Sequence, residues 1–466
     1  MVLPFRPNFS TTIKNHNSRR KVRCPARLDE DYPFPQDRRC YRSRLRSCHV
    51  NQSTALATEG AMDYIQDFDI RLEKEMYYAG ETLSGHVILD TVENFKLKAI
   101  RVLLRGKAHA EWKVVVSGDR RTVKDDHVFI DDRVVIWGKE KLEGNLPILP
   151  RGRHSFPFRF QLPESALPCS FESRSCTVRY YVKVTVDIPY ASPPQGMKYF
   201  TVIGPHIDCM DEQYLKPLMG ADHRATCCLC CRRGVVSVRS NLERSAYCCG
   251  ESIRLKADID NQSDEVLRIK LKLVQYVEFF IDRGVLGMTK EASHTVLEYR
   301  GEPISPSTRS KFDSSSSLVV PVMPPTLIGV CRLLQIYYVL KVWVEMEKSG
   351  DDLHMNFPIT IATCPFRIPN SNQQPKIEYE MCCDHVEGGM YIGPEFLLGQ
   401  VYDGTGCQEE GETVVLYRPV YVCVKSKTKN DQGSSTRTDD SAAQPPPPKS
   451  PRPEVVVVVD NKQAQA

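Results

Sequence analysis

Residues 177–188 read TVRYYVKVTVDI, and this stretch does most to predict the fold class. Its apolar side chains fall at every second position: Val178, Tyr180, Val182, Val184, Val186 and Ile188. The positions between them are mostly polar: Arg179, Lys183, Thr185 and Asp187. A period of two is typical of a β-strand with one face in a core and the other in water. The stretch therefore predicts a half-buried strand.

Other segments repeat this alternation. In residues 155–162 the apolar positions are Phe156, Phe158, Phe160 and Leu162, and residues 100–105 alternate in a similar way. Turn residues separate these segments, and no long stretch shows the 3.6-residue period of a helix. We therefore predict an all-β protein built from antiparallel, immunoglobulin-like β-sandwiches.

Two pairs of segments indicate an internal repeat. YYAGE at 77–81 returns as YCCGE at 247–251, and YYVKV at 180–184 returns as YYVLKV at 337–342. Both pairs occur in the same order, and their offsets are similar, at 170 and about 157 residues. The sequence therefore predicts two similar domains in tandem.

Changes in composition suggest where these domains begin and end. The predicted ranges are a disordered basic arm (1–60), an N-terminal domain (61–205), a connection (206–231), a C-terminal domain (232–368), a partly ordered extension (369–424) and a disordered Pro/Ser-rich tail (425–466). The arm is interpreted as a solvated basic segment. A mitochondrial presequence, or a nuclear signal at 19–23, would have a similar composition.

Charge and hydropathy narrow the functional class. The net charge is +4, with +7 in residues 1–60 and −3 in the rest of the 466 residues, which argues against a nucleic-acid surface. No apolar run approaches the roughly 18 residues of a membrane helix, and no secretory signal is evident. We expect a cytoplasmic protein whose 18 cysteines are mostly reduced thiols.

Several longer motifs resemble the arrestin-domain proteins of the alpha-arrestin branch, over about two-thirds of the chain. In the first domain they are YYAGETLSGHVIL (77–89), LPILPRGRHSFPFRFQLP (146–163), SCTVRYYVKVTV (175–186) and GPHIDCMD (204–211). In the second they are CCLCCRRGVVSV (227–238) and GESIRLKADIDNQS (250–263). The resemblance implies two arrestin-type sandwiches.

The resemblance also implies a function. Alpha-arrestins are non-catalytic adaptors that link membrane receptors and transporters to HECT-type ubiquitin ligases and endosomal sorting. It therefore implies no cofactor, and peripheral association with the plasma membrane or endosomes. A structural subunit of a sorting or coat complex, similar to the arrestin-fold retromer component, is the alternative. The sequence also lacks the phosphate-loop, dinucleotide, zinc-protease and nucleophile-elbow motifs of common enzymes.

Ligase recruitment in this family runs through PPxY motifs, which this sequence lacks. The nearest match is Arg418-Pro419-Val420-Tyr421, without the first proline. Pro419 and Tyr421 are the candidate WW-domain ligands, with a weaker contact than a complete motif would make. Tyr417 and Tyr421 also each begin a Y-x-x-apolar sorting pattern, and the segment could instead be a short strand. A second candidate is the polyproline stretch Pro445, Pro446, Pro447 and Pro448, beside a Ser-Pro phosphorylation pattern at Ser450.

Two cysteine clusters also invite a functional interpretation. Cys227, Cys228, Cys230 and Cys231 precede Arg232 and Arg233, which makes them candidates for S-acylation, since a lipid chain next to basic residues gives two membrane signals. Structural zinc and plain thiols are the alternatives for this cluster. Cys227/Cys230 and Cys228/Cys231 both have the C-x-x-C spacing, but the further pair of ligands that tetrahedral zinc needs is missing. The second cluster, CCDH at 382–385, also lacks a further pair of ligands at metal-binding spacing.

Overall fold

The computed structural model describes residues 64–139, 145–190, 193–228, 231–281, 287–314, 317–347, 352–369, 374–382, 386–388 and 419–425. All of them fall within one compact unit, residues 59–466. The predicted arm, and the predicted tail apart from Lys425, lie outside the described residues.

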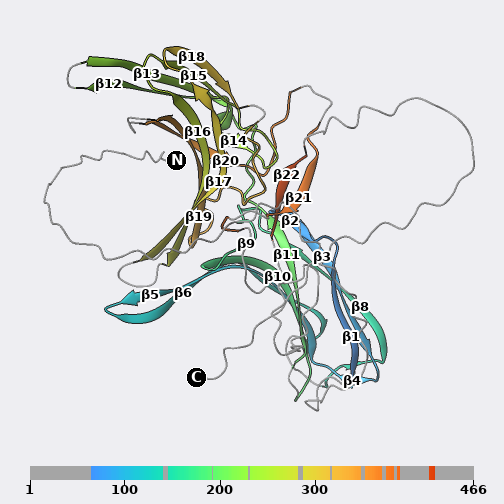
Figure 1. Cartoon of the computed structure of the whole chain (residues 1–466). Coiled ribbons are helices and arrows are strands. Elements are labelled where there is room, and N and C mark those ends of the chain that lie inside the picture. Colours follow the sequence, from blue (N-terminus) through green and yellow to red (C-terminus); the bar gives the residue numbers. More distant parts are fainter. Residues whose placement is uncertain are drawn as a thin grey trace, which may run out of the picture. The chain divides into compact units, whose positions relative to one another are not determined.

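The first domain is a sandwich of two main sheets (Figure 1). One sheet has the order β1-β3-β8, and the other has the order β2-β11-β10-β5-β6 with β9 beside β10. β4 and β7 form a separate two-stranded sheet. The bounds are β1 (Ile65–Leu72), β2 (Met76–Tyr78), β3 (Thr82–Thr91), β4 (Phe95–Lys96), β5 (Ala99–Val116), β6 (Asp119–Gly138), β7 (Ile148–Leu149), β8 (Gly152–Gln161), β9 (Phe171–Glu172), β10 (Cys176–Asp187) and β11 (Gln195–Ile203).

The second domain repeats this plan with sheets in the orders β12-β13-β15-β18 and β14-β20-β19-β16-β17. Its strands are β12 (Leu218–Cys228), β13 (Cys231–Leu242), β14 (Ala246–Tyr247), β15 (Leu255–Asn261), β16 (Leu267–Ile281), β17 (Met288–Ile304), β18 (Thr308–Asp313), β19 (Leu334–Met346) and β20 (Leu353–Ile361). The described residues contain one α-helix, α1 (Glu212–Leu215). No helix among them is long and apolar enough to span a membrane.

Alternating burial produces the core of each sandwich, as the sequence predicted. Along β10 every second residue is buried, including Val178 and Val182. β19 follows the same pattern, and Tyr338 and Val342 point inward. Burying a valine side chain contributes roughly 1.5–3 kcal/mol, so each strand is a major source of stability. The prediction of two tandem β-sandwiches is confirmed.

The predicted repeat is also visible in side-chain contacts. The Tyr180 hydroxyl donates to the carbonyl of Pro168 over 2.8 Å, and the Tyr338 hydroxyl donates to the carbonyl of Pro324 over 2.6 Å. Each bond ties the central strand of a sandwich to the loop before it. The structural partner of Tyr180 is thus Tyr338, the second tyrosine of the YYVLKV match.

Strands also occupy ranges that the sequence assigned to connecting segments. β12 lies in the predicted connection 206–231, where it pairs with β13 along one edge of the second sandwich. Most of its described side chains are exposed or half-buried, so the sequence shows little alternation there. In the predicted extension 369–424, β21 (Ile377–Met381) pairs antiparallel with β22 (Val420–Val424). We call these two strands the C-terminal ribbon.

Candidate functional site

The candidate site is the junction where the C-terminal ribbon meets both sandwiches. β22 pairs with β21 along one edge, with Tyr421 opposite Glu380. Along its other edge Cys423 forms an isolated bridge with Cys249, and the Val424 N–H donates to the Cys249 carbonyl over 2.8 Å. The main chain of β22 is therefore bonded on both sides.

Burial distinguishes β22 from an ordinary surface strand. Tyr421, Val422 and Cys423 are buried in succession, and Pro419 just before the strand is buried as well. A half-exposed strand would show alternation, so three successive buried residues mean that both faces of β22 are covered. The apolar sequence VYVCV fits this position, and β22 carries no charged residue.

Tyr421 reaches the first sandwich from this position. Its side chain is 2% exposed, and its hydroxyl lies 3.4 Å from the Ser170 carbonyl and 3.2 Å from that of Gly388. Cys169, Cys382 and Val386 complete the buried cluster around it. A hydroxyl that leaves water needs such acceptors, because an unpaired buried polar group costs about 1–3 kcal/mol.

A small cavity beside Tyr421 shows how many elements meet here. Residues of both sandwiches and of β22 line it: Cys169, Ile203, Gly204, Cys249, Met323, Pro325, Ile361, Ala362, Thr363, Tyr421 and Val422. These residues come from widely separated parts of the chain. The ribbon therefore completes the packing between the two sandwiches.

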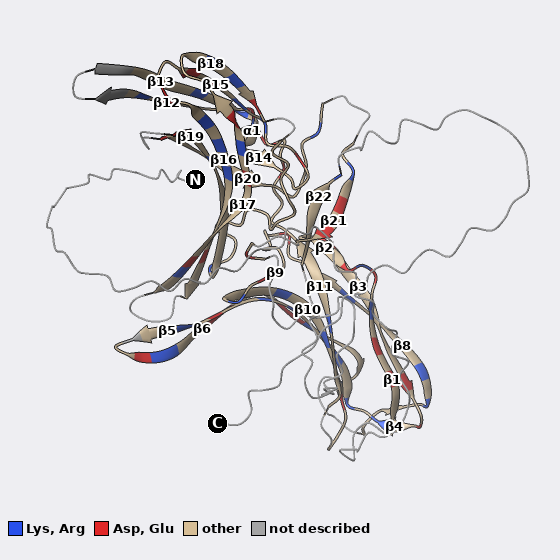
Figure 2. Cartoon of the chain, in the orientation of Figure 1, with Lys and Arg blue, Asp and Glu red and all other residues tan. Residues whose placement is uncertain are grey.

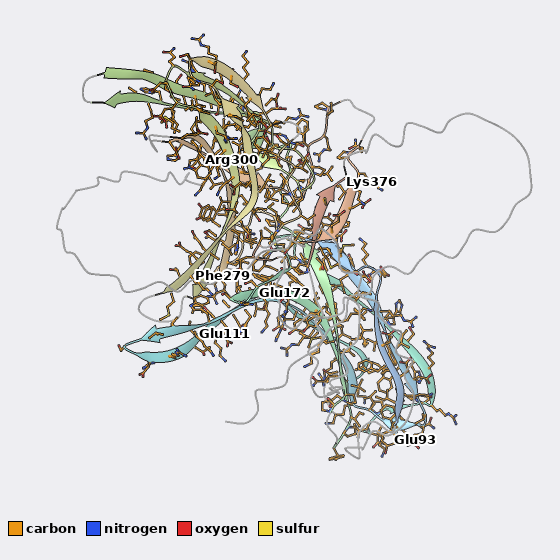
Figure 3. The ribbon with its side chains drawn as sticks, viewed as in Figure 1. Glu93, Glu111, Glu172, Phe279, Arg300 and Lys376 are labelled. Carbon is orange, nitrogen blue, oxygen red and sulfur yellow. The ribbon has the colours of Figure 1, made fainter. Side chains whose placement is uncertain are left out.

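β21 makes a second contact with the first sandwich. The hydroxyls of Tyr78 and Tyr379 lie 2.8 Å apart, and burial, together with this bond, raises the pKa of Tyr78. On the same strand Glu378 is paired with Lys376 and Lys425, and the hydrogen bond from Lys425 is the main cause of its lowered pKa. In Figure 2 the ribbon of β21 is red where its acidic residues lie and that of β22 is tan, and Figure 3 labels Lys376, the residue just before β21.

The two sandwiches also touch directly. Arg332 makes a two-pronged ion pair with the buried carboxylate of Asp125, at 2.6 and 3.0 Å. Lys290 of β17 donates to the Ser175 hydroxyl over 2.7 Å. Bidentate pairs of this kind are geometrically specific, so they favour one orientation of the sandwiches.

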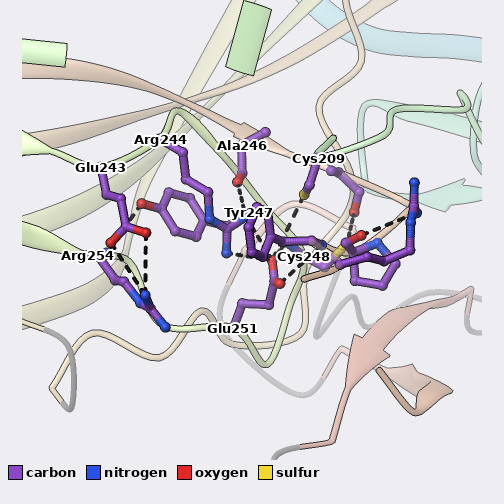
Figure 4. A network of polar contacts seen from close by, with 12 residues as sticks. Cys209, Glu243, Arg244, Ala246, Tyr247, Cys248, Glu251 and Arg254 are labelled. Atoms are coloured by element: carbon purple, nitrogen blue, oxygen red, sulfur yellow. Dashed lines mark hydrogen bonds and ion pairs between the residues drawn. The ribbon is translucent and has the colours of Figure 1, made fainter. Parts of the chain in front are cut away.

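A buried polar network lies under the ribbon, in the turn after β14 (Figure 4). Glu251 accepts hydrogen bonds from the main-chain N–H groups of Cys248 and Phe366 and pairs with Arg244 at 3.3 Å. The Arg244 guanidinium stacks 4.2 Å from the ring centre of Tyr247.

The same network contains a triad with metal-ligating groups. The thiols of Cys209 and Cys248 and the Glu251 carboxylate offer atoms within 4.8 Å of one another. The hydrogen bond to Cys209, followed by burial, raises the pKa of Cys248, which favours the neutral thiol. The carboxylate is already satisfied, and the neighbouring guanidinium would repel a cation. The geometry fits a structural network better than a metal centre.

The structure brings together only some of the predicted site residues. Pro419 and Tyr421 lie together at β22, whereas Tyr417 and Pro445 to Pro448 fall outside the described residues. Cys227, Cys228 and Cys231 lie where β12 turns into β13, with Cys228 opposite Cys231, and Cys230 is outside the described residues. Cys382 is buried beside Tyr421, and residues 383–385 are also outside.

Sequence reasoning missed the partners of Tyr421 and the Asp125–Arg332 pair. Ser170 is 251 residues from Tyr421, and Asp125 is 207 residues from Arg332. No local pattern marks such contacts. The run of uncharged residues in β22 was the one available hint of burial.

Comparisons with known proteins match both domains. Residues 66–208 match the model of the arrestin (or S-antigen) N-terminal domain, and residues 232–366 match that of the C-terminal domain. Arrestin domain-containing protein 4 is 27% identical in mouse and 28% in human, each over 66% of this chain and 74% of the relative. Thioredoxin-interacting protein from pig is 25% identical over 62% of this chain and 72% of its own length.

Proposed function

This chain belongs to the arrestin family, in its alpha-arrestin branch, and from that membership we propose that it is a trafficking adaptor. The proposed adaptor binds cytoplasmic regions of membrane receptors or transporters and links them to ubiquitin ligases and endosomal sorting. It acts without catalysis or a cofactor, in the cytoplasm, with peripheral association to the plasma membrane or endosomes.

One observation carries the ligase half of the proposal. Pro419 directly precedes β22 and Tyr421 lies in it, and this strand follows both arrestin domains and packs against each. An adaptor needs its ligase ligand physically coupled to its cargo-binding domains, and β22 supplies that coupling. A WW groove takes a proline ring in an aromatic slot and the tyrosine in a second pocket.

Proximity labelling in cells tests whether the C-terminal segment recruits the ligases while the arrestin domains bind the membrane proteins. The full chain should label membrane receptors or transporters together with HECT-type ligases. A chain lacking residues 369–466 should lose the ligases and keep the membrane proteins. If the shortened chain still labels the ligases, the ligase contact does not lie in the C-terminal segment.

Gel filtration of a native lysate distinguishes a transient adaptor from a stable subunit of a sorting or coat complex. A transient adaptor should elute mostly near its own mass of 53.0 kDa. Elution of nearly all the protein in a fixed large complex would favour the sorting-complex alternative.

Membrane attachment through the cysteine hairpin is part of the proposal. Cys227 and Cys228 end β12, Cys231 begins β13, and the sequence continues with Arg232 and Arg233, while Cys230 falls outside the described residues. Acyl-exchange labelling should detect hydroxylamine-sensitive lipid on this segment. Replacing the four cysteines by serine should abolish the signal and reduce the membrane-bound fraction, and an unlabelled wild-type segment would remove acylation from the proposal.

The pig relative is named for its interaction with thioredoxin, and we do not extend that partner to this chain. The cysteines whose side chains the structure describes are buried, apart from the half-buried Cys364. Burial also raises the pKa of the Cys364 thiol. Thiols of this kind are poor nucleophiles for disulfide exchange.

A further inference from the structure

We propose that the folded chain masks its own WW ligand, so that a WW domain can capture Tyr421 only after β22 has left the junction between the two sandwiches. This inference rests on the proposed function, because it concerns the ligand named there. It adds a regulatory step, in which ligase capture competes with the contacts that hold the sandwiches together.

The bound and masked forms of the motif exclude each other. A WW ligand lies in a polyproline II conformation, with no partner strand and with its proline and tyrosine rings presented outward. Here both rings, Pro419 and Tyr421, are buried. The main chain of Tyr421 pairs with Glu380, and that of Val424 bonds to Cys249. A WW domain therefore has no access to the motif until β22 separates from both neighbours.

Opening would release contacts to both sandwiches at once. Tyr421 would leave the Ser170 carbonyl of the first sandwich, and Val424 would leave Cys249 of the second. Val422 would leave the wall of the cavity between them. By linkage, a WW domain that holds β22 open weakens the junction to the same extent that the junction weakens WW binding.

The ribbon is the element best suited to open. Each of its strands has five residues, and two-stranded ribbons have little stability of their own. It lies beyond residue 366, where the match to the C-terminal arrestin domain ends. The direct contacts Arg332–Asp125 and Lys290–Ser175 do not involve the ribbon, so the sandwiches keep points of contact when it leaves. Local opening of such a segment needs less free energy than unfolding a sandwich.

Isothermal titration with a WW domain from a HECT-type ligase tests the masking. The three ligands are a peptide of residues 414–425, the full chain, and the full chain carrying Val422→Asp. This valine is 4% exposed and lies outside the ring pair, so the charge should displace β22 without altering the motif. The full chain should bind at least about tenfold more weakly than the peptide, and Val422→Asp should recover affinity to within about threefold of the peptide.

Two controls separate masking from side effects. A peptide with Val422→Asp should bind like the parent peptide, and calorimetry should show both sandwiches still unfolding cooperatively in the full-length variant. Alkylation of Cys423, followed by mass spectrometry, reports opening directly, because this thiol is buried in the closed ribbon. Its rate should rise in Val422→Asp and when the WW domain is added to the wild type, while that of Cys176 in the first sandwich should not change.

The outcomes distinguish the two proposals. If the parent peptide does not bind, the ligand assignment in the proposed function fails, and the masking inference fails with it. If the peptide and the unmodified full chain bind equally well, the ligand stands and the masking alone is overturned. Binding by the full chain with no rise in Cys423 alkylation would also overturn the masking.

Discussion

The turn after β2 in the first sandwich and the turn after β14 in the second have the same backbone geometry but different surroundings. In the first, Gly80 has a φ of 78° and Glu81 accepts the N–H of Tyr78 over 3.1 Å. In the second, Gly250 has a φ of 84° and Glu251 accepts the N–H of Cys248 over 2.8 Å. Both repeats therefore share the positive-φ glycine and the hydrogen bond from a main-chain N–H to the following glutamate.

The surroundings of the two turns differ. Glu81 pairs with Lys74, and their side chains are 33% and 57% exposed. Glu251 pairs with Arg244, and theirs are 11% and 8% exposed. The second turn is covered by the segment before α1, by Phe366 and by β22. The ion pair at this turn is therefore largely exposed in the first domain. In the second domain it is buried, and β22 packs on the turn.

The largest expected difference in stability between the two turns comes from removing the charge of each carboxylate. Glu251→Gln leaves the buried guanidinium of Arg244 without its counter-charge, and breaking such a pair costs about 3–5 kcal/mol. Glu81→Gln breaks an exposed pair and should cost within about 1 kcal/mol. Calorimetry of the full-length variants, with the transitions of the two sandwiches fitted separately, measures both. Equal losses would remove the proposed distinction between the turns.

Adding a methyl group to each turn glycine tests whether β22 depends on the second turn. Both Gly→Ala changes place alanine at positive φ, at a cost of about 1–2 kcal/mol. At Gly80 the new Cβ would lie 3.7 Å from the nearest atom, in Glu164, whereas at Gly250 it would lie 2.0 Å from the Val424 carbonyl oxygen.

Gly250→Ala should therefore displace β22. It should lose the stability that the ribbon contributes, in addition to the backbone penalty, and alkylation of Cys423 should become faster. Gly80→Ala is the matched control, with a similar backbone penalty and no contact with β22. An unchanged Cys423 rate in Gly250→Ala would show that β22 does not rest on this turn.

The central tyrosines show where the two sandwiches should behave more alike. Tyr180→Phe and Tyr338→Phe each remove a hydroxyl bonded to a proline carbonyl, which should cost about 1–2 kcal/mol. The two losses should therefore be similar. Thermal unfolding of the two variants measures them, and losses that differ by more than about 1 kcal/mol would contradict the likeness of the two repeats.

The sequence predicted the parts of this molecule that depend on local periodicity. β10 and β19 alternate because one sheet face is buried, and the matched YYAGE and YCCGE turns keep a glycine where the backbone needs positive φ. β12 was missed because it is a polar edge strand with little burial.

The candidate site was only partly predictable for a related reason. The short strand was one of three open interpretations of residues 417–424, because five uncharged residues fit a strand or a ligand equally well. The choice depends on Ser170, Cys249 and Gly388, which are distant in the sequence. Tertiary contacts, which no local pattern encodes, therefore decide whether the motif is exposed.

The smallest expected effect concerns the ribbon's contact with the first turn. Tyr78 occupies the position that Cys248 has in the second repeat, and it reaches the ribbon through the 2.8 Å hydroxyl contact with Tyr379. Tyr379 is 36% exposed, so water can replace the lost partner in Tyr379→Phe, and the cost should be about 0.5 kcal/mol or less. Alkylation of Cys423 should then rise by less than about threefold, well below the rise in Gly250→Ala. A rise as large as that in Gly250→Ala would mean that both turns hold the ribbon equally, because the side-chain contact would then match the main-chain pairing at Cys249.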